Sequence, residues 1–192
     1  MKKLFLILGF LICFIQWTSC QSQTRKSSAN SMDSSSNIST STWKEARYNN
    51  VSFKYPPNWF YEEEVIQGLP RMSATPNIVK DIKMLRAFEI IELTPNDWTF
   101  ADFKNNFIST ISNRGPSKAT LIKKEITKFK KYEAIYAEII QDPKESSFHT
   151  KAYGINAGKH IYLVTILCKS KNHQFEPDFD KITSEILKSL TL

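Results

Sequence analysis

A chain of 192 residues in which 41% are hydrophobic is long and apolar enough to build one packed domain of ordinary size. Its 26 basic and 19 acidic side chains give a formal net charge of +7, which favours anionic surfaces such as phospholipid headgroups or acidic glycans. Charge of this size is poor evidence for nucleic-acid binding, and the few, unclustered glycines disfavour a glycine-rich phosphate loop.

The first nineteen residues have the layout of an export signal. Lys2 and Lys3 form a basic start, twelve apolar residues follow at 4–15, and a short polar approach leads to Cys20. Twelve helical residues extend roughly 18 Å, well short of the roughly 30 Å hydrocarbon core of a bilayer, so a permanent spanning helix is disfavoured. We therefore expect residues 1–19 to be a signal peptide.

Cys20 has no expected disulfide partner, because Cys13 leaves with the signal and Cys168 lies in an apolar strand. Small residues at 18–19 precede Cys20, and the stretch resembles the lipobox of bacterial lipoproteins, in which this cysteine is lipid-modified. Trp17 departs from the leucine usual at that place. The resemblance implies lipidation of Cys20 and attachment to a membrane through the lipid. The alternative is a plain secretory signal beside an incidental cysteine.

A tether is expected between this cysteine and the folded part of the chain. The twenty-two residues after Cys20 include nine Ser and three Thr, and almost nothing in them can offset the entropy cost of ordering. Residues 20–42 are therefore predicted to be the lipidated cysteine and a flexible tether that reaches about 25 Å. Gln21 resembles the residue found in lipoproteins sent to an outer membrane. We expect a lipid-anchored protein of the cell envelope, on the outer membrane and facing the periplasm.

Residues 43–192 are predicted to form a single domain that opens with two strands and a proline corner between them. The apolar side chains that alternate along these strands are Val51, Phe53 and Tyr55, then Trp59, Tyr61 and Val65. Residues 84–94 are apolar on both faces, which is typical of a central strand covered on each side.

The clearest helix follows this central strand. Thr99 and Asp102 can form a capping box at its start, and Gly115-Pro116 ends it. One stripe of the helix is apolar and must be buried. Its members are Phe100, Phe103, Phe107 and Ile111.

A run of strands and a closing helix complete the domain. The strands are expected at 121–129, 132–141, 148–155 and 161–168, with a hairpin turn at 156–158 between the last two. The closing helix spans about 177–190, starts near Pro177 and carries an apolar stripe of Phe179, Ile182, Ile186 and Leu190. This order of elements predicts an α+β domain with a mainly antiparallel sheet flanked by helices.

The opening pattern resembles that of PsbP/Mog1-like domains. Its residues are Val51, Phe53, Tyr55, Pro56 and Trp59, and the helix that ends in "ILKSL" completes the likeness over residues 43–192. The resemblance implies an α/β/α sandwich of the kind found in accessory and binding proteins more often than in enzymes. Many such domains place Asn-Gly in the hairpin before the strand at 132–141. Here Lys130-Lys131 stands in that turn, so the motif leaves the hairpin register open.

No group of residues in the sequence predicts catalysis or a metal site. His149, His160 and His173 match no compact ligand spacing. His149 and His160 facing each other across a hairpin would give two ligands at most, and exposed hairpin histidines are the alternative. Cys168 is expected to be a buried, inert thiol. We expect no catalytic residues, no metal and no cofactor.

Five lysines crowd the strand at 121–129 and the turn after it, where they interleave with apolar side chains. They are Lys123, Lys124, Lys128, Lys130 and Lys131. One interpretation is the wet face of an edge strand that lysines protect against aggregation. The other is a surface for an anionic partner.

The function expected from the sequence is a lipid-anchored cell-envelope binding or assembly accessory module without catalytic activity. Its partner is expected to be an envelope protein or an anionic glycan, and not nucleic acid. A carrier or sensor of a small amphiphilic ligand, held in a cleft between sheet and helix, is the alternative, and an envelope hydrolase is a third reading.

Overall fold

Nine strands and two helices make up the described part of the chain. The computed structural model describes residues 39–76, 86–95, 99–112, 119–141, 147–170 and 175–192. The elements are β1 (Lys44–Tyr48), β2 (Val51–Tyr55), β3 (Phe60–Ile66), β4 (Leu69–Thr75), β5 (Arg86–Leu93), α2 (Phe100–Ser112), β6 (Ala119–Phe129), β7 (Tyr132–Gln141), β8 (Ser147–Asn156), β9 (Ile161–Ser170) and α3 (Pro177–Ser189).

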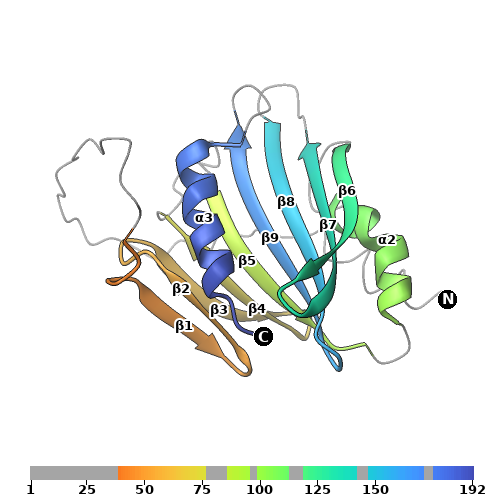
Figure 1. Ribbon diagram of the computed structural model, residues 1–192, viewed down its shortest axis with the longest axis horizontal. Helices are drawn as coiled ribbons and strands as arrows, with labels where there is room; N and C mark the ends of the chain where they lie inside the picture. The colour runs from red at the N-terminus through yellow and green to blue at the C-terminus, as the bar shows by residue number, and fades with distance from the viewer. Residues whose placement is uncertain (1–38, 77–85, 96–98, 113–118, 142–146, 171–174) are drawn as a thin grey trace.

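Seven of these strands form one antiparallel sheet in the order β3-β4-β5-β9-β8-β7-β6, and β1 pairs with β2 in a separate hairpin. Helix α3 and the β1–β2 hairpin lie on one face of the sheet, and α2 lies on the other (Figure 1). The predicted α+β sandwich with a mainly antiparallel sheet is therefore confirmed. The sequence analysis predicted β2 but not β1, so it did not include this hairpin in the α3 layer.

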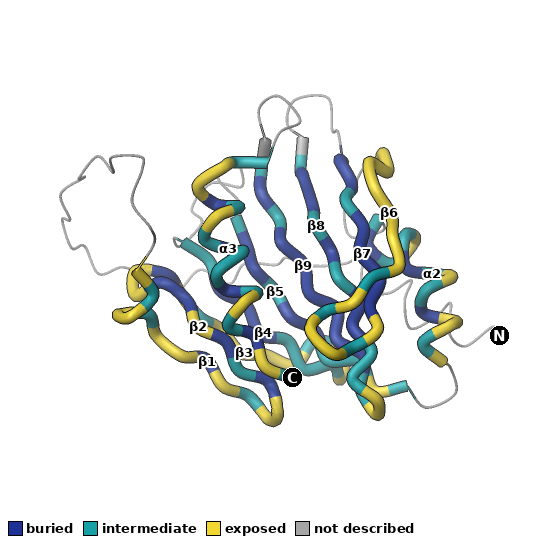
Figure 2. The backbone as a smooth tube through the Cα atoms, in the orientation of Figure 1, coloured by how far each residue is buried: buried dark blue, intermediate teal, exposed yellow. Residues whose placement is uncertain are grey.

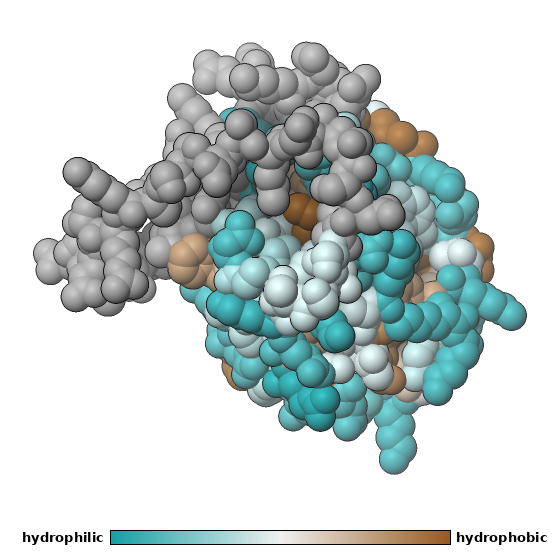
Figure 3. Space-filling model, turned by 60° about the vertical axis from the view of Figure 1, so that its left-hand side comes forward, coloured by the Kyte–Doolittle hydropathy of each residue, from teal (hydrophilic) through white to brown (hydrophobic). Residues whose placement is uncertain are grey.

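Two apolar cores lie on the two faces of the sheet. The core under α3 and the hairpin includes Phe53, Phe88 and Phe179, and the core under α2 includes Phe107 and Ile135. Figure 2 shows the middle strands as buried and β6 as largely exposed. The face that carries β1, β2 and α3 is mostly hydrophilic in Figure 3, as expected for the outer surface of a covering layer.

The strand predictions hold for the second half of the domain, and β7 spans the predicted 132–141. Strand β5 is central as predicted, since it lies between β4 and β9 and buries Ile90 on the α3 side and Ile91 on the α2 side. In the first half, β1 and β4 were not predicted. Val65 belongs to the expected alternating series, but its side chain is 63% exposed because β3 is an edge strand.

Helix α2 starts as its capping box predicts. The Thr99 amide donates to Asp102 Oδ2 over 2.8 Å, and the Asp102 amide donates to Thr99 Oγ1 over 3.2 Å. Its buried residues are Phe103, Phe107 and Ile111. The predicted stop at 115–116 lies outside the described residues, as does the first part of the strand predicted at 84–94.

The tight turn that joins β6 and β7 settles the hairpin register that the motif left open. Phe129 pairs with Tyr132, so Lys130 and Lys131 form a two-residue turn. Lys130 has a φ of 53°, in the left-handed region that glycine or asparagine usually occupies in such turns. A lysine therefore takes this place at some conformational cost, and its side chain makes compensating contacts, described below.

Candidate functional site

A groove of about 630 Å³ lies between the curled β6–β7 hairpin and the C-terminal part of α3. Helix α3 runs over β5 and β9, and the β6–β7 hairpin curls toward the same side of the sheet (Figure 1). The groove is lined by Lys123, Glu125, Thr127, Lys128, Phe129, Lys130, Tyr136, Tyr153, Leu187 and Lys188. The register directs the Lys128 side chain to the other face of the sheet, so the charges at the groove are those of Lys123, Lys130 and Lys188 against Glu125. The lining is therefore positive, which suits an anionic ligand.

Aromatic rings form the floor of the groove. The ring centroids of Tyr136 and Tyr153 are 4.9 Å apart, and those of Phe129 and Tyr153 are 6.0 Å apart. The Lys123 ammonium lies 5.5 Å from the centroid of Tyr136 and forms a 2.9 Å ion pair with Glu125. Burial raises the pKa values of both tyrosines above their usual range, so their hydroxyls stay neutral. Tyr136 is buried, so the half-buried rings of Phe129 and Tyr153 are the accessible part of the floor, with positive charge at the rim.

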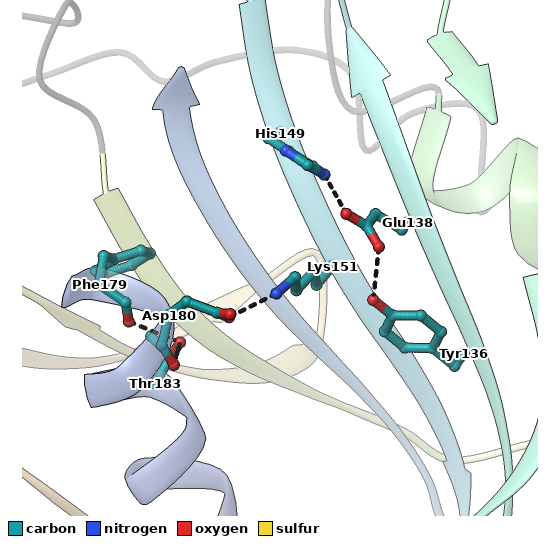
Figure 4. Close-up of polar contacts among 7 residues, drawn as sticks. All are labelled: Tyr136, Glu138, His149, Lys151, Phe179, Asp180 and Thr183. Atoms are coloured by element: carbon teal, nitrogen blue, oxygen red, sulfur yellow. Dashed lines mark hydrogen bonds and ion pairs between the residues drawn. The ribbon is translucent and has the colours of Figure 1, made fainter. Parts of the chain in front are cut away.

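A chain of polar contacts starts at Tyr136 in the groove and runs along the face of the sheet (Figure 4). The Tyr136 hydroxyl donates to Glu138 Oε2 over 3.1 Å, and Glu138 Oε1 lies 2.5 Å from His149 Nε2. Burial lowers the pKa of His149, although Glu138 opposes the shift, and the residue is 5% exposed. A neutral ring that donates from Nε2 leaves Nδ1 as a buried nitrogen that has no hydrogen-bond partner among the described residues.

A second polar contact connects β8 to α3. Lys151 Nζ lies 2.6 Å from Asp180 Oδ1, and Figure 4 shows the two side chains pointing toward each other across the face of the sheet. The same ammonium lies 4.3 Å from the centroid of Phe175. This contact ties the N-terminal end of α3 to β8.

The five predicted lysines do not form one surface. Lys123 lies in the groove, whereas Lys124 pairs with Ala137 and therefore points to the α2 face, as does Lys128 opposite Glu133. The Lys131 ammonium lies 5.1 Å from the Tyr132 ring.

Lys130 has a structural contact at the end of α3. Its ammonium donates to the main-chain oxygens of Lys188 over 3.0 Å and Leu190 over 2.5 Å, where a helix leaves carbonyl groups without partners. The charge of Lys130 is thereby committed to the fold, although its side chain borders the groove.

The two described histidines lie at opposite ends of the β8–β9 hairpin. His149 pairs with Cys168, and His160 lies in the turn with its Nδ1 2.9 Å from Glu92 Oε1. The idea that His149 and His160 face each other is wrong, because the long register of the hairpin separates them. The alternative expectation, an exposed histidine in the hairpin, is also wrong for His149. His173 lies outside the described residues, and within these no three His, Cys, Asp or Glu side chains cluster as metal ligands.

Cys168 is buried, as predicted for a structural thiol. Burial raises its pKa to about 11, so the thiolate is scarce at neutral pH. His149 is its cross-strand neighbour, but its Nε2 is engaged with Glu138. This pair therefore lacks the properties of an activated nucleophile and base.

The proposed anchor lies outside the described residues, since these begin at residue 39 and Cys20 precedes them. Neither α2 nor α3 has the length and apolar character that a bilayer-crossing helix requires, and this finding covers the described residues alone.

Comparisons with solved structures support the fold. The solution structure of cyanobacterial PsbP (CyanoP) from Synechocystis sp. PCC 6803 has 15% sequence identity and a TM-score of 0.53, with 83% of this chain and 98% of that chain covered. A variant of the protein Mog1 has 8% identity and a TM-score of 0.50, with 78% and 95% covered. A protein of unknown function from Pseudomonas aeruginosa, a putative regulator by its description, has 12% identity and a TM-score of 0.41, with 66% and 82% covered.

No family model matches the chain, and no curated protein matches it. At these identities the likeness is one of fold alone. The fold is α+β and PsbP/Mog1-like, as the residues of the opening motif predicted. One member of that motif, Trp59, stacks on Phe179 of α3 with a centroid distance of 5.7 Å. This residue of the motif therefore has a packing role against α3.

Sequence reasoning missed Tyr136, Glu138 and Tyr153 as members of a site. They lie within the strands predicted at 132–141 and 148–155, and tyrosine counts as an apolar residue in the pattern that predicts a strand. The available signal was Glu138 near the middle of a mostly apolar strand, because a carboxylate at a half-buried position requires a partner.

Proposed function

We propose that this protein is a non-catalytic binding module of the cell envelope, held at a membrane by lipidated Cys20, and that the groove beside α3 binds an anionic envelope glycan. The observation that carries the proposal is the combination of a positive rim with an aromatic floor in one open groove. Lysine ammonium groups attract carboxylate or sulfate groups, and ring faces offer contact to the apolar side of a sugar.

The lysines at the groove can exchange their present partners for a ligand. Lys123 is paired with Glu125 and Lys188 with Glu185, but the lysine side chains are 53% and 71% exposed. Exposed ion pairs of this kind contribute little to stability, so breaking them to bind a polyanion costs little. The envelope location is supported by the export signal, the cysteine after it and the Ser/Thr-rich segment.

The test uses the mature chain with Cys20→Ser, titrated with a sulfated heparin oligosaccharide by calorimetry. The double variant Lys123→Glu/Lys188→Glu is expected to bind at least tenfold more weakly. The matched control Lys44→Glu/Lys159→Glu carries the same change in net charge on exposed lysines outside the groove and is expected to bind within twofold of the parent. Equal losses in both variants would mean general charge attraction and would contradict a groove site.

A carrier of a small amphiphilic ligand is the second candidate, favoured by the tyrosine floor. Native mass spectrometry of gently purified protein distinguishes the two, because a carrier retains a discrete added mass and a glycan-binding module does not. An envelope hydrolase is less well supported, since the thiol of Cys168 is buried and its pKa is raised.

A further inference from the structure

A different surface, the outer edge of β6, carries exposed apolar side chains that the groove does not explain. β6 ends the seven-stranded sheet, and among the described residues no strand pairs with its outer edge. Leu121, Ile122 and Ile126 are 46%, 53% and 60% exposed. An edge strand of eleven residues with free backbone groups is a template for pairing with another chain.

The register shows which β6 side chains share a face. Leu121 pairs with Ile139 and Ile126 with Ile135, both of which lie in the core under α2. Lys124 on the same face pairs with Ala137. The α2 face of β6 therefore presents alternating apolar and basic side chains, and α2 does not cover them.

Lys128 completes this alternation on the same face, opposite Glu133, whose carboxylate accepts from Lys104 of α2 over 2.6 Å. After the irregularity between Leu121 and Lys123, the register with β7 is continuous to Phe129. Seven residues, 123–129, thus offer a regular edge with basic, apolar and basic side chains at alternate positions on one face.

We propose that the edge of β6 binds an extended acidic segment of a partner protein by strand addition, with an apolar residue opposite Ile126 and acidic residues opposite Lys124 and Lys128. In strand addition, main-chain hydrogen bonds provide affinity and alternate side chains provide specificity. Side chains directly opposite each other in paired strands interact, and opposite charges there are favourable.

A second copy of this chain fits the same edge poorly. In the antiparallel register that joins two Ile126 residues, Lys124 of each copy lies opposite Lys128 of the other. Like charges directly opposite each other destabilise a strand pair, and this register contains two such pairs. The lysines therefore disfavour self-pairing and favour an acidic partner over a second copy.

The test uses the mature chain with Cys20→Ser and a labelled, capped peptide of the pattern Thr-Glu-Thr-Ile-Thr-Glu-Thr, with affinity measured by fluorescence anisotropy. The peptide reads the same in both directions, so strand orientation does not affect the result. Binding is expected in the micromolar to millimolar range, with slower hydrogen exchange at the β6 amides. A peptide of the same composition with its two glutamates adjacent is expected to bind at least tenfold more weakly.

A charge swap separates pairing from general attraction. The variant Lys124→Glu/Lys128→Glu is expected to bind the acidic peptide at least tenfold more weakly. It is also expected to bind a counterpart peptide in which lysine replaces both glutamates. Ile126→Thr keeps a β-branched residue in the strand and is expected to weaken binding several-fold without unfolding the domain. Lys44→Glu on β1 and Lys188→Glu in the groove are expected to leave peptide binding unchanged, which separates this surface from the glycan site.

Three results would overturn the proposal: no binding of the acidic peptide up to several millimolar, equal binding of the rearranged peptide, or no gain from the charge swap. Binding of anionic vesicles that depends on Ile126, with no peptide binding, would assign this surface to a membrane and would also overturn it.

Discussion

The ammonium of Lys130 donates to the main-chain oxygen of Leu190, so the turn between β6 and β7 is joined to the end of α3. Two elements that are far apart in the chain, and that form the two walls of the groove, thus share a charge-assisted contact. A cation at a helix C-terminus also interacts favourably with the helix dipole. Lys130 therefore helps to set the width of the groove, together with Tyr132, whose hydroxyl donates to the main-chain oxygen of Leu192 over 2.9 Å.

Replacing this lysine should lower stability more than replacing its neighbour. Lys130→Met removes two hydrogen bonds to carbonyl groups and is expected to reduce the free energy of unfolding by about 1 kcal/mol. Lys131→Met loses only a contact with the Tyr132 ring and is the matched control. Urea denaturation of both variants measures the difference. Equal midpoints would show that the Lys130 contact contributes no net stability.

His149 should make stability depend on pH in a defined window. Burial holds its folded-state pKa below the unfolded value of about 6.5, so the unfolded chain binds more protons as pH falls. The contribution is therefore fully present above about pH 7 and is lost as pH falls through 6.5 toward the lower folded pKa. Glu138 and Asp180 oppose the pKa shift, and Lys151 adds to it.

The variant His149→Gln tests this, because an amide can still donate to Glu138 but does not titrate. Urea midpoints at pH 7.5 and 5.5 are expected to differ less in His149→Gln than in the parent chain. Equal stability of the parent chain at both pH values would contradict this prediction, because it would mean that protonation of His149 does not destabilise the folded state.

Gly154 should not tolerate a side chain. A Cβ atom there would lie 2.9 Å from Ile135 Cγ2 and would overlap the ring of Phe103, so β8 and α2 cannot keep their present packing. Gly154→Ala is expected to destabilise the domain by about 1–3 kcal/mol through overpacking. The comparison is Gly158→Ala, at a positive φ of 82° with open space around it, which should cost about 1 kcal/mol. Thermal and urea unfolding measure both, and the reverse order would contradict the close approach of α2.

Lipidation should depend on a single residue. The parent chain is expected to sediment with the membrane fraction and to incorporate a clickable fatty acid. The Cys20→Ser protein is expected to be released from the membrane and to remain unlabelled. Cys168→Ser keeps the anchor and is the matched control. A Cys20→Ser protein that still sediments with membranes would contradict the anchor.

Local signals explain where the sequence predicted the fold well. The capping box at Thr99 and Asp102 and the apolar stripes of both helices depend on neighbours within a few residues, and the structure confirms them. Strand β1 was missed because "KEARY" buries only Ala46 and shows no alternation of its own. Strand β4 was missed because Pro70 argues against a strand, yet it lies outside the part of β4 that pairs with β5.

The site required information that the sequence does not carry in local form. The groove lies between the β6–β7 hairpin and α3, and the Lys130 contact that joins its two walls links residues 60 positions apart in the chain. Lys123, Lys124 and Lys128 are near neighbours in the chain, but the register sends them to two faces of the sheet. A cluster of charges in sequence is therefore not a cluster in space when it lies on a strand.

The β1–β2 hairpin determines which part of the domain unfolds first under tension. Lys44 pairs with Tyr55 at the open end of this hairpin, while Ser52 of β2 is tied to Thr191 by two main-chain hydrogen bonds of 2.7 and 3.0 Å. If the domain is held through the residues before β1, as proposed, tension enters at Lys44 and peels β1 from β2 one pair at a time. Strand β2 stays in place, because Val51, Phe53 and Tyr55 are buried under α3. β1, which contributes Ala46 to the core, would act as an extensible link that yields before β2 and the rest of the core are disturbed.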